Sequence, residues 1–348
     1  MLDTRIQEAL PALYDLTPSV EKTRATWEIY KTMARVLSPA DWALHAPYVI
    51  AINRLKRERN AVILAHNYMT PEIYHGVADF VGDSLALAIR ATEVEQDIIV
   101  QCGVHFMAET AKILNPAKTV LIPDASAGCS LAESITPEGI ARMRAEYPGA
   151  PVVSYVNTTA EVKATSDICC TSANALQVVD AVKGDTVIMT PDRFLAQNVA
   201  NRTKKRVVWW DGACVVHELY TADDLRAYRE LNPEVKIVAH PECRPDVVAE
   251  ADYTGSTSGI VNWVRRNRPK QAMLVTECSM ASNIADELPE VTFAKPCNMC
   301  PYMKKITLEK ILWALHSGEV EVTVAPGIAD RARRAITRMI DLGREAER

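Results

Sequence analysis

The sequence predicts an α/β protein of three homologous three-layer αβα domains, each with a short parallel sheet, around a pseudo-threefold axis. A residue pattern that starts at Cys129 is repeated from Cys214, with a threonine at +7, a proline at +19 and a serine or threonine at +43. A third copy starts at Cys300, so the copies lie 85 and 86 residues apart. This period is too long for a solenoid but suits an α/β unit of three or four strands. Short apolar runs alternate with helix patterns between the cysteines, as expected of that class.

Length and composition exclude several classes of protein. The chain has 348 residues, 48% of them hydrophobic, and a formal net charge of −5, so it can form two or three domains with real cores. It has no basic patch with interleaved aromatic residues, so we expect no nucleic-acid partner. No apolar run reaches the roughly 18 residues of a membrane span, and the start lacks a signal-peptide core, so we expect a cytoplasmic protein without membrane contact. Nine cysteines in such a chain favour metal or redox use over structural disulfides.

The N-terminal segment, residues 1–58, is predicted to be a helical extension. Apolar side chains between Trp27 and Leu37 recur at helical spacing, and Pro39 interrupts the pattern. We expect this segment to cover another part of the protein or to form an oligomer contact.

The first α/β unit is predicted at residues 59–135. Its first strand, 61–65, is continuously apolar, as expected of a strand buried on both faces. Thr70 and Pro71 then mark a helix start, because threonine is a good N-cap and proline is tolerated in the first helical turn. The other expected elements are a helix that opens at Gly82-Asp83-Ser84, strands at 97–100 and 119–122, and a helix at 106–114.

Units two and three repeat this plan at residues 136–220 and 221–325. Each starts with a helix at the repeated threonine and continues with a strand, a turn that opens a second helix, and a further strand. The C-terminal segment, residues 326–348, is expected to hold a helix over about 330–342, with Gly343 as its stop. The predicted strands are 152–157, 186–189 and 207–210 in unit two and 235–242 and 273–275 in unit three.

Polar residues follow the first strand of each unit, where parallel sheets present ligand-binding groups. Seventeen or eighteen residues later each unit has a hydroxyl where a helix begins, and helix N-termini favour anions. The sequence therefore predicts a central site for a ligand with several negative groups. The pairs are His66 with Tyr68, Tyr155 with Asn157, and His240 with Glu242, and the hydroxyls are those of Ser84, Ser172 and Thr257.

Some of these residues have a plainer interpretation. Ser84, Ser172 or Thr257, each taken alone, is more typical of a helix N-cap than of a ligand. A capping histidine at a strand end would explain His66 or His240 about as well as function would. The equivalent positions of the two histidines in two units favour function.

Cys129, Cys214 and Cys300 are expected to meet at the centre of the three units. Thiolates select zinc, copper(I) or iron–sulfur clusters. Structural zinc normally takes four protein ligands, two of them in a short C-x2–4-C knuckle, whereas these cysteines lie on three distant loops. A [4Fe–4S] cluster held by three cysteines leaves one iron free to act on a substrate hydroxyl or carboxylate as a Lewis acid. This combination suggests dehydration or condensation of small hydroxy or keto acids.

The other cysteines and two aromatic residues have simpler interpretations. The C-x-x-C spacing of Cys297 and Cys300, taken alone, is about equally typical of zinc binding and redox exchange. The register of the repeat selects Cys300 and leaves Cys297 as its neighbour. Trp209 and Trp210 are predicted in the core. Five cysteines at strands or strand ends are expected to be packing residues: Cys102, Cys169, Cys170, Cys243 and Cys278.

Several motifs, in order from about residue 59 to 316, resemble those of the quinolinate synthase family. They are Ala65-His66-Asn67-Tyr68, Gly82-Asp83-Ser84-Leu85, Met107-Ala108-Glu109-Thr110-Ala111-Lys112-Ile113-Leu114, Cys129-Ser130-Leu131, Tyr155-Val156-Asn157-Thr158, Gly212-Ala213-Cys214-Val215-Val216-His217, His240-Pro241-Glu242, Gly255-Ser256-Thr257-Ser258 and Cys300-Pro301-Tyr302-Met303.

The resemblance implies three homologous α/β domains and one oxygen-sensitive [4Fe–4S] cluster per chain on Cys129, Cys214 and Cys300. It implies a transferase that condenses iminosuccinate with dihydroxyacetone phosphate to quinolinate, phosphate and water on the route to NAD, with L-aspartate oxidase supplying the imine. Tyr68 and His217 match catalytic residues, and we expect Glu242 and Tyr68 to carry protons, because a closed cleft can move their pKa values toward working pH. The substrate ligands implied are His66, Ser84, Tyr155, Asn157, Ser172, His240, Glu242 and Thr257.

The sequence departs from the family pattern at one position, and two other protein classes stay open as alternatives. Some family members carry C-x-x-C-x-x-C, whose first two cysteines can form a redox disulfide; position 294 is alanine here, which puts such a switch in doubt. An aconitase-type [4Fe–4S] hydro-lyase would share the open iron without needing dihydroxyacetone phosphate. A zinc-binding or redox scaffold protein would use Cys297 and Cys300 together. A radical S-adenosylmethionine enzyme is disfavoured, since a C-x3-C-x2-C run is absent.

Overall fold

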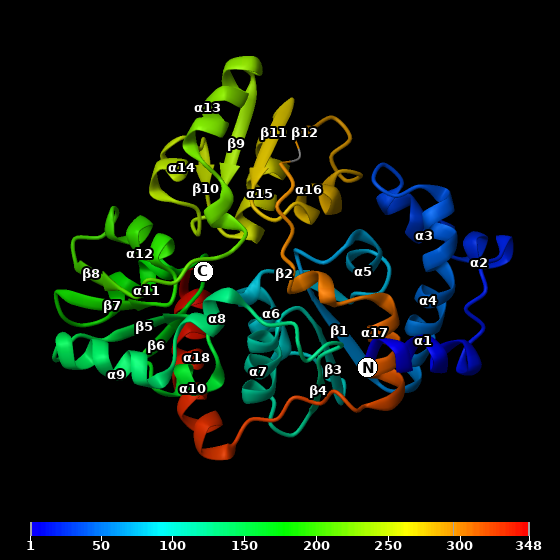
Figure 1. Cartoon of the computed structure of the whole chain (residues 1–348), viewed down its shortest axis with the longest axis horizontal. Helices are drawn as coiled ribbons and strands as arrows, with labels where there is room; N and C mark the ends of the chain where they lie inside the picture. Colours follow the sequence, from blue (N-terminus) through cyan, green and yellow to red (C-terminus); the bar gives the residue numbers. More distant parts are fainter. Residues whose placement is uncertain (1, 295, 347–348) are drawn as a thin grey trace.

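The computed structural model describes residues 2–294 and 296–346. Its named strands form three separate four-stranded sheets in which every pairing is parallel. The strand orders are β2-β1-β3-β4, β6-β5-β7-β8 and β10-β9-β11-β12, so the three sheets share one topology. Figure 1 shows these sheets and their helices grouped around a common centre. The predicted fold class, three αβα units with short parallel sheets, is confirmed.

Each sheet takes its strands from one continuous stretch of chain. Within that stretch, crossover connections join the parallel neighbours. The first sheet consists of β1 (Ala61–His66), β2 (Phe80–Gly82), β3 (Ile98–Cys102) and β4 (Thr119–Leu121). The second consists of β5 (Val152–Tyr155), β6 (Ile168–Cys170), β7 (Thr186–Thr190) and β8 (Arg206–Trp209). The third consists of β9 (Val235–Ala239), β10 (Tyr253–Thr254), β11 (Gln271–Val275) and β12 (Thr292–Ala294).

Helices flank the sheets, and none of those described combines the length and apolar character needed to cross a bilayer. In the described chain four α-helices and one 3-10 helix (Lys31–Met33) precede the first sheet; the α-helices are α1 (Leu2–Leu13), α2 (Val20–Ala25), α3 (Trp27–Tyr30) and α4 (Pro39–Glu58). The later helices are α5 (Pro71–Tyr74), α6 (Ser84–Ala91), α7 (His105–Leu114), α8 (Ser130–Ser134), α9 (Pro137–Glu146), α10 (Ala160–Ala164), α11 (Ala175–Ala181), α12 (Arg193–Ala200), α13 (Ala222–Leu231), α14 (Pro245–Ala249), α15 (Thr257–Asn267), α16 (Ser279–Ile284), α17 (Leu308–Ser317) and α18 (Pro326–Ala346).

The repeated threonines have one structural role. Thr136, Thr221 and Thr307 are the N-caps of α9, α13 and α17, and each side chain accepts a hydrogen bond from the backbone N–H three residues later. Such a bond satisfies one of the free N–H groups of a helix start. The sequence repeat at this position therefore encodes the same helix start three times.

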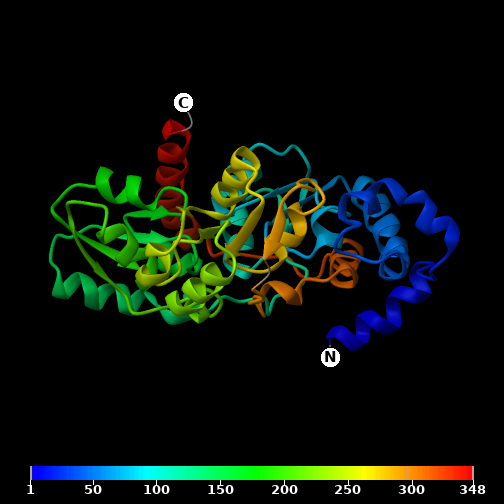
Figure 2. The same ribbon diagram turned by 90° about the horizontal axis from the view of Figure 1, so that it is seen from above.

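The helix of the third repeat copy packs against the N-terminal helices of the chain. Helix α17 packs against α4, α1 and β3, and Figure 1 shows it beside the N-terminal helices. Within the predicted helical extension (residues 1–58), the described residues 2–58 thus lie against the first sheet and α17. Helix α18 packs on α10, β6 and α7, and in Figure 2 it extends beyond the layer formed by the three sheets. The limits of the units remain predictions.

Predictions for three single residues were wrong. Gly343 does not end the last helix, because α18 continues to Ala346. Trp209 is 39% exposed rather than buried, since β8 is the edge strand of its sheet, whereas Trp210 is half-buried and donates its indole N–H to Ser134 O at 2.9 Å. Cys278 is half-buried and contacts another thiol. The other four predicted packing cysteines are fully buried: Cys102, Cys169, Cys170 and Cys243.

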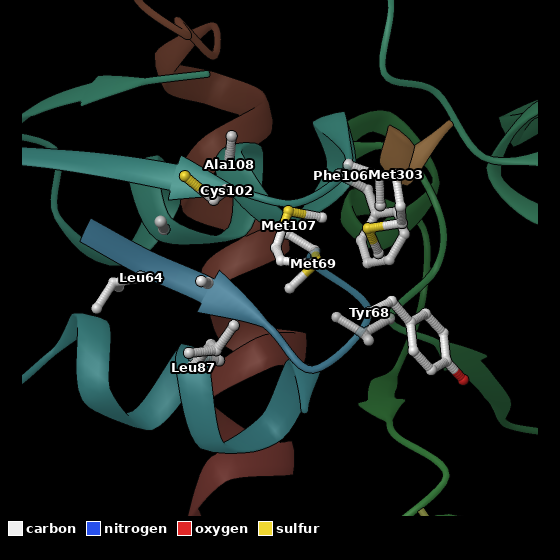
Figure 3. Packing of buried hydrophobic residues seen from close by; sticks show 14 of the residues in the cluster. Leu64, Tyr68, Met69, Leu87, Cys102, Phe106, Met107, Ala108 and Met303 are labelled. Atoms are coloured by element: carbon white, nitrogen blue, oxygen red, sulfur yellow. The ribbon is translucent and has the colours of Figure 1, made fainter. Parts of the chain in front are cut away.

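The apolar core reaches up to the ends of the strands. Figure 3 shows this in the first unit, where Met69 and Met107 lie near the end of β1 and Leu87 lies across that strand, all within one buried cluster. In the same view the hydroxyl of Tyr68 points away from these side chains. Tyr68 therefore keeps its ring in the core while its hydroxyl is directed away from the core.

Candidate active site

Loops at the carboxyl ends of the strands of all three sheets converge on one pocket. The predicted pairs follow the first strand of each sheet, the hydroxyls follow the second, and the cysteines follow the fourth. The pocket holds about 660 Å³ of space between protein atoms, including space open to solvent. All thirteen residues predicted for the site line it: His66, Tyr68, Ser84, Cys129, Tyr155, Asn157, Ser172, Cys214, His217, His240, Glu242, Thr257 and Cys300. Their individual roles stay predictions.

The three cysteines have the same local backbone. The carbonyl oxygens of Cys129, Cys214 and Cys300 each accept a hydrogen bond from the N–H four residues later, at 2.9, 3.1 and 3.2 Å. The backbone N–H groups two and three residues after each cysteine donate to its sulfur. Such paired donors suit a thiolate or a metal-bound sulfur. Burial still raises the pKa of Cys129 to about 12 and raises the pKa values of Cys214 and Cys300 as well, so metal binding would have to displace their protons.

Side chains connect the three cysteine loops. Ser130, next to Cys129, donates to Ala213 O at 3.1 Å and accepts from the N–H of Val215 at 3.3 Å, which joins the first loop to the second. The hydroxyl of Tyr302 donates to the Glu133 carboxylate at 3.2 Å, which joins the third loop to the first. The three loops therefore form one connected rim of the pocket.

A single metal ion fits the three cysteines poorly. Thiolates bound to one zinc at ~2.3 Å lie within about 4.6 Å of each other. Among the described residues, one group of three possible ligand atoms lies within 4.8 Å of one another. This group combines Cys214 with His217 and Glu242 and does not include the thiols of Cys129 and Cys300. The three thiols line one pocket but are spaced too widely for a single ion, and each faces two backbone N–H groups. This arrangement fits a larger inorganic cluster.

His66 and His240 occupy equivalent places and have the same hydrogen bonds. The N–H of Tyr68 donates to Nδ1 of His66 at 3.2 Å, and the N–H of Glu242 donates to Nδ1 of His240 at 3.3 Å. Because Nδ1 is the acceptor in both neutral rings, Nε2 carries the proton. Each ring can therefore donate one hydrogen bond from Nε2 to a carboxylate or carbonyl oxygen.

Glu242 is the buried acidic group of the pocket. Its carboxylate accepts hydrogen bonds from the Tyr155 hydroxyl and lies 2.9 Å from Nδ1 of His217, whose ring stacks on His240 with 4.6 Å between centroids. Burial alone would raise the pKa of Glu242, but His217 and His240 bring it well below its usual range. Glu242 is therefore an ionised carboxylate at neutral pH.

Tyr68 belongs to a second hydrogen-bonded group. Its hydroxyl lies 2.7 Å from Oγ1 of Thr276 and 3.4 Å from Nε2 of His217, and Thr276 lies 3.0 Å from the same His217 nitrogen. Together with the bond from His217 to Glu242, these contacts give a continuous path from the carboxylate to the phenol. Burial raises the pKa of Tyr68 well above its usual value, so the phenol is protonated. The expectation that the pocket moves both pKa values toward working pH is therefore wrong.

The three predicted hydroxyls are not helix caps. The N-cap residues of α6, α11 and α15 are Asp83, Asn174 and Ser256, each of which precedes the helix in question. Ser84, Ser172 and Thr257 instead line the pocket. The Oδ1 atom of Asn157 is buried there and has no hydrogen-bond partner among the described residues. A buried acceptor of this kind calls for a donor from a ligand.

The match to the model of the family described as quinolinate synthetase A protein covers residues 50–341. The chain belongs to the quinolinate synthase family. It is 59% identical over 326 residues to a quinolinate synthase of Sinorhizobium medicae, which spans 94% of this chain and 90% of that protein. A quinolinate synthase of Agrobacterium fabrum is 57% identical over 329 residues, 94% of this chain and 95% of that protein. A quinolinate synthase of Xylella fastidiosa is 60% identical over 290 residues, which cover 83% of this chain and 86% of that protein. The protein is therefore an enzyme of NAD biosynthesis.

Several residues around the pocket lie outside the predicted site. Thr276 follows the third strand of its sheet, whereas the predicted residues follow the first, second and fourth strands. The Asn67 amide donates to Thr257 Oγ1 at 2.9 Å and links units one and three. Lys304 pairs with the fully buried Glu277 at 2.8 Å and donates to Tyr68 O at 2.6 Å. The equivalence of the third strand ends would have drawn attention to Thr276, but no local signal marks the partners of Asn67 and Lys304.

The lowered pKa values of His66 and His240 predict a loss of stability in acid. Burial lowers the pKa of His66 to about 4 and that of His240 to about 3. Unfolded histidine binds a proton near pH 6.5, so from there to about pH 4 the unfolded chain holds more protons and stability falls as pH falls. We expect the free energy of unfolding, from urea titrations at pH 7 and pH 5, to drop by about 2 kcal/mol less in His66→Asn than in the wild type.

The matched control is His45→Asn. His45 lies on α4 and does not line the pocket. This variant should show the pH dependence of the wild type. If His66→Asn also kept the full wild-type pH dependence, the neutral buried state of His66 would be contradicted.

Proposed function

We propose that this chain condenses iminosuccinate with dihydroxyacetone phosphate to quinolinate, phosphate and water, as a cytoplasmic enzyme that holds one [4Fe–4S] cluster on Cys129, Cys214 and Cys300. The proposal depends mainly on one observation: three thiols from three loops and a ring of polar side chains line the same pocket. The relatives named quinolinate synthase, which match most of the chain, support the proposed reaction. L-aspartate oxidase is the proposed functional partner, because the reaction needs a source of the unstable imine.

The dicarboxylate substrate is bound by neutral donors. His66 and His240 each offer an Nε2–H, and the hydroxyl-bearing residues Ser84, Ser172 and Thr257 line the same pocket. Hydrogen bonds to ionised carboxylates are stronger than those between neutral partners, so uncharged donors suffice to hold the substrate. Oδ1 of Asn157 accepts a hydrogen bond from the imine or a hydroxyl of the substrate.

Proton transfer uses the path between Glu242 and Tyr68. The ionised Glu242 takes a proton from the substrate carbon that forms the new bond, and His217, 2.9 Å away, stabilises the change in charge. Thr276 connects His217 to the Tyr68 hydroxyl at 3.0 and 2.7 Å, so Tyr68 can return a proton to a leaving oxygen. Cys129, Cys214 and Cys300 would hold the cluster, whose iron without a protein ligand would supply a Lewis acid for a substrate hydroxyl or carboxylate. Tyr155 donates to Glu242 and fixes the direction of its carboxylate.

The test combines metal analysis with a coupled assay. Protein purified without oxygen should contain about four iron and four sulfide per chain. With L-aspartate oxidase and aspartate as the source of imine, quinolinate should form only when dihydroxyacetone phosphate is present. About one zinc per chain would support the scaffold alternative, and turnover of a hydroxy acid without the triose phosphate would support a hydro-lyase; either result would overturn the proposal.

A further inference from the structure

Two cysteines outside the pocket form a close thiol pair. The Sγ atoms of Cys278 and Cys297 lie 2.6 Å apart, although the residues are 19 positions apart in the chain. Cys297 is exposed and Cys278 is half-buried. Neither lines the pocket that contains Cys129, Cys214 and Cys300. The pair is therefore separate from the proposed cluster ligands and accessible from solvent.

The backbone explains why these thiols meet. The chain leaves β11 and forms a parallel bridge between Glu277 and Asn298, which keeps the register of the β11–β12 pairing, since residues 21 positions apart are partners in both. Cys278 follows Glu277 and is the N-cap residue of α16, while Cys297 precedes Asn298. The two cysteines thus stand on adjacent segments on either side of one backbone bridge.

The separation of the sulfurs suits covalent closure. A disulfide bond is about 2.05 Å long, and it requires the two β-carbons to approach each other from neighbouring backbone segments. Two sulfurs at 2.6 Å are already nearer than unbonded thiols normally pack, so only a small adjustment is needed. Burial raises the pKa of Cys278 to about 12, which leaves the exposed Cys297 as the thiol that an external reagent meets first.

We propose that Cys278 and Cys297 form a reversible intrachain disulfide by exchange with a low-molecular-weight disulfide such as oxidised glutathione. The Cys297 thiolate attacks one sulfur of the reagent, forming a mixed disulfide and releasing one reduced thiol. Cys278 loses its proton and attacks Cys297 Sγ, which closes the protein disulfide and releases the second reduced thiol. The protein dithiol loses two electrons and two protons, and the reagent is reduced to two thiols. Cys300 takes no part.

The bridge would act on the loop that carries Cys300. Cys297 lies three residues before Cys300, and the N–H of Cys300 donates to the Glu277 carboxylate at 3.4 Å. Glu277 also pairs with Lys304 at 2.8 Å. A bond between Cys278 and Cys297 would therefore fix the Cys300 loop to the end of β11 while leaving the Cys300 sulfur free.

Peptide mapping of the whole enzyme, with its metal content intact, tests the disulfide directly. The protein is incubated under argon with oxidised glutathione or with dithiothreitol, denatured, and alkylated with iodoacetamide. Cleavage after glutamate separates residues 278–287 from 291–309, whereas trypsin would leave both cysteines in one peptide because Lys295 precedes proline. We expect oxidation to join these two peptides through Cys278 and Cys297, to remove two alkylatable thiols per chain, to be reversed by dithiothreitol, and to leave the iron content unchanged.

Three variants make the result specific. Cys278→Ser and Cys297→Ser should each abolish the linked peptides, whereas Cys243→Ala, which removes a fully buried thiol, should retain them. A persistent glutathione adduct on Cys297 with Cys278 alkylated, a link through Cys300, or no oxidation in the wild type would overturn the proposal. None of these readouts requires quinolinate synthesis, so the result does not depend on the proposed reaction.

Discussion

Cys214→Ser is expected to lose the cluster, with iron falling from about four to below about one per chain and quinolinate synthesis falling at least ~10³-fold. Serine keeps the size of the side chain, but its hydroxyl is a poor ligand for iron and stays protonated, whereas thiolates are the ligands that hold iron–sulfur clusters. The backbone donors from Val216 and His217 that face the sulfur would remain in place. Iron and sulfide analysis and the visible absorption of protein prepared without oxygen measure the effect.

Cys297→Ser is the matched control, because Cys297 lies three residues from Cys300 but outside the pocket. We expect it to keep a complete cluster, while Cys129→Ser and Cys300→Ser should lose theirs as Cys214→Ser does. Loss of iron from Cys297→Ser together with normal iron in Cys214→Ser would show that the ligand set is wrong.

Glu242→Gln is expected to lower kcat by about 10³-fold while the iron content stays normal. The amide keeps the shape of the side chain but cannot accept a proton, and it replaces the charge that stands 2.9 Å from His217. Because the hydrogen bond from Tyr155 can still be made to the amide oxygen, KM should change less than kcat. Steady-state rates with both substrates varied, together with iron analysis, separate these effects.

Glu287→Gln provides the comparison for this variant. Glu287 forms a partly exposed ion pair with Arg265 at 2.6 Å, and such pairs contribute little to stability. This variant should keep a wild-type kcat. A kcat for Glu242→Gln within a factor of three of the wild type would contradict the assignment of Glu242 as the base.

The fold could be predicted because the sequence contains the same local structure three times. The repeated threonines are true N-caps, and the apolar run of residues 61–65 is a fully buried strand. Both features depend on nearby residues only, since a cap satisfies an N–H three residues on and a buried parallel strand needs apolar side chains on both faces. Trp209 shows the limit of such reasoning, because the sequence does not state that β8 is an edge strand.

Most of the pocket could be predicted for a related reason. In parallel sheets of one topology, the residues that follow equivalent strands lie at equivalent places, so the ends of strands one, two and four identified twelve of the thirteen predicted lining residues. His217 was predicted from the family resemblance alone, and Thr276, which follows a third strand, lies outside the pattern. The direction of the pKa shift of Glu242 was also predicted wrongly, because it depends on His217, which comes from another unit.

The sequence by itself determined the strands, the repeated helix starts, the three cysteine loops and the polar residues at the strand ends, because these features are set by residues close together in the chain. Only the tertiary structure decided that His217 lies between Glu242 and Thr276, and that Cys278 rather than any nearer residue faces Cys297. Contacts of this kind depend on how loops pack against each other after the sheets have formed. No periodicity or local preference along the chain encodes the distance between two such side chains.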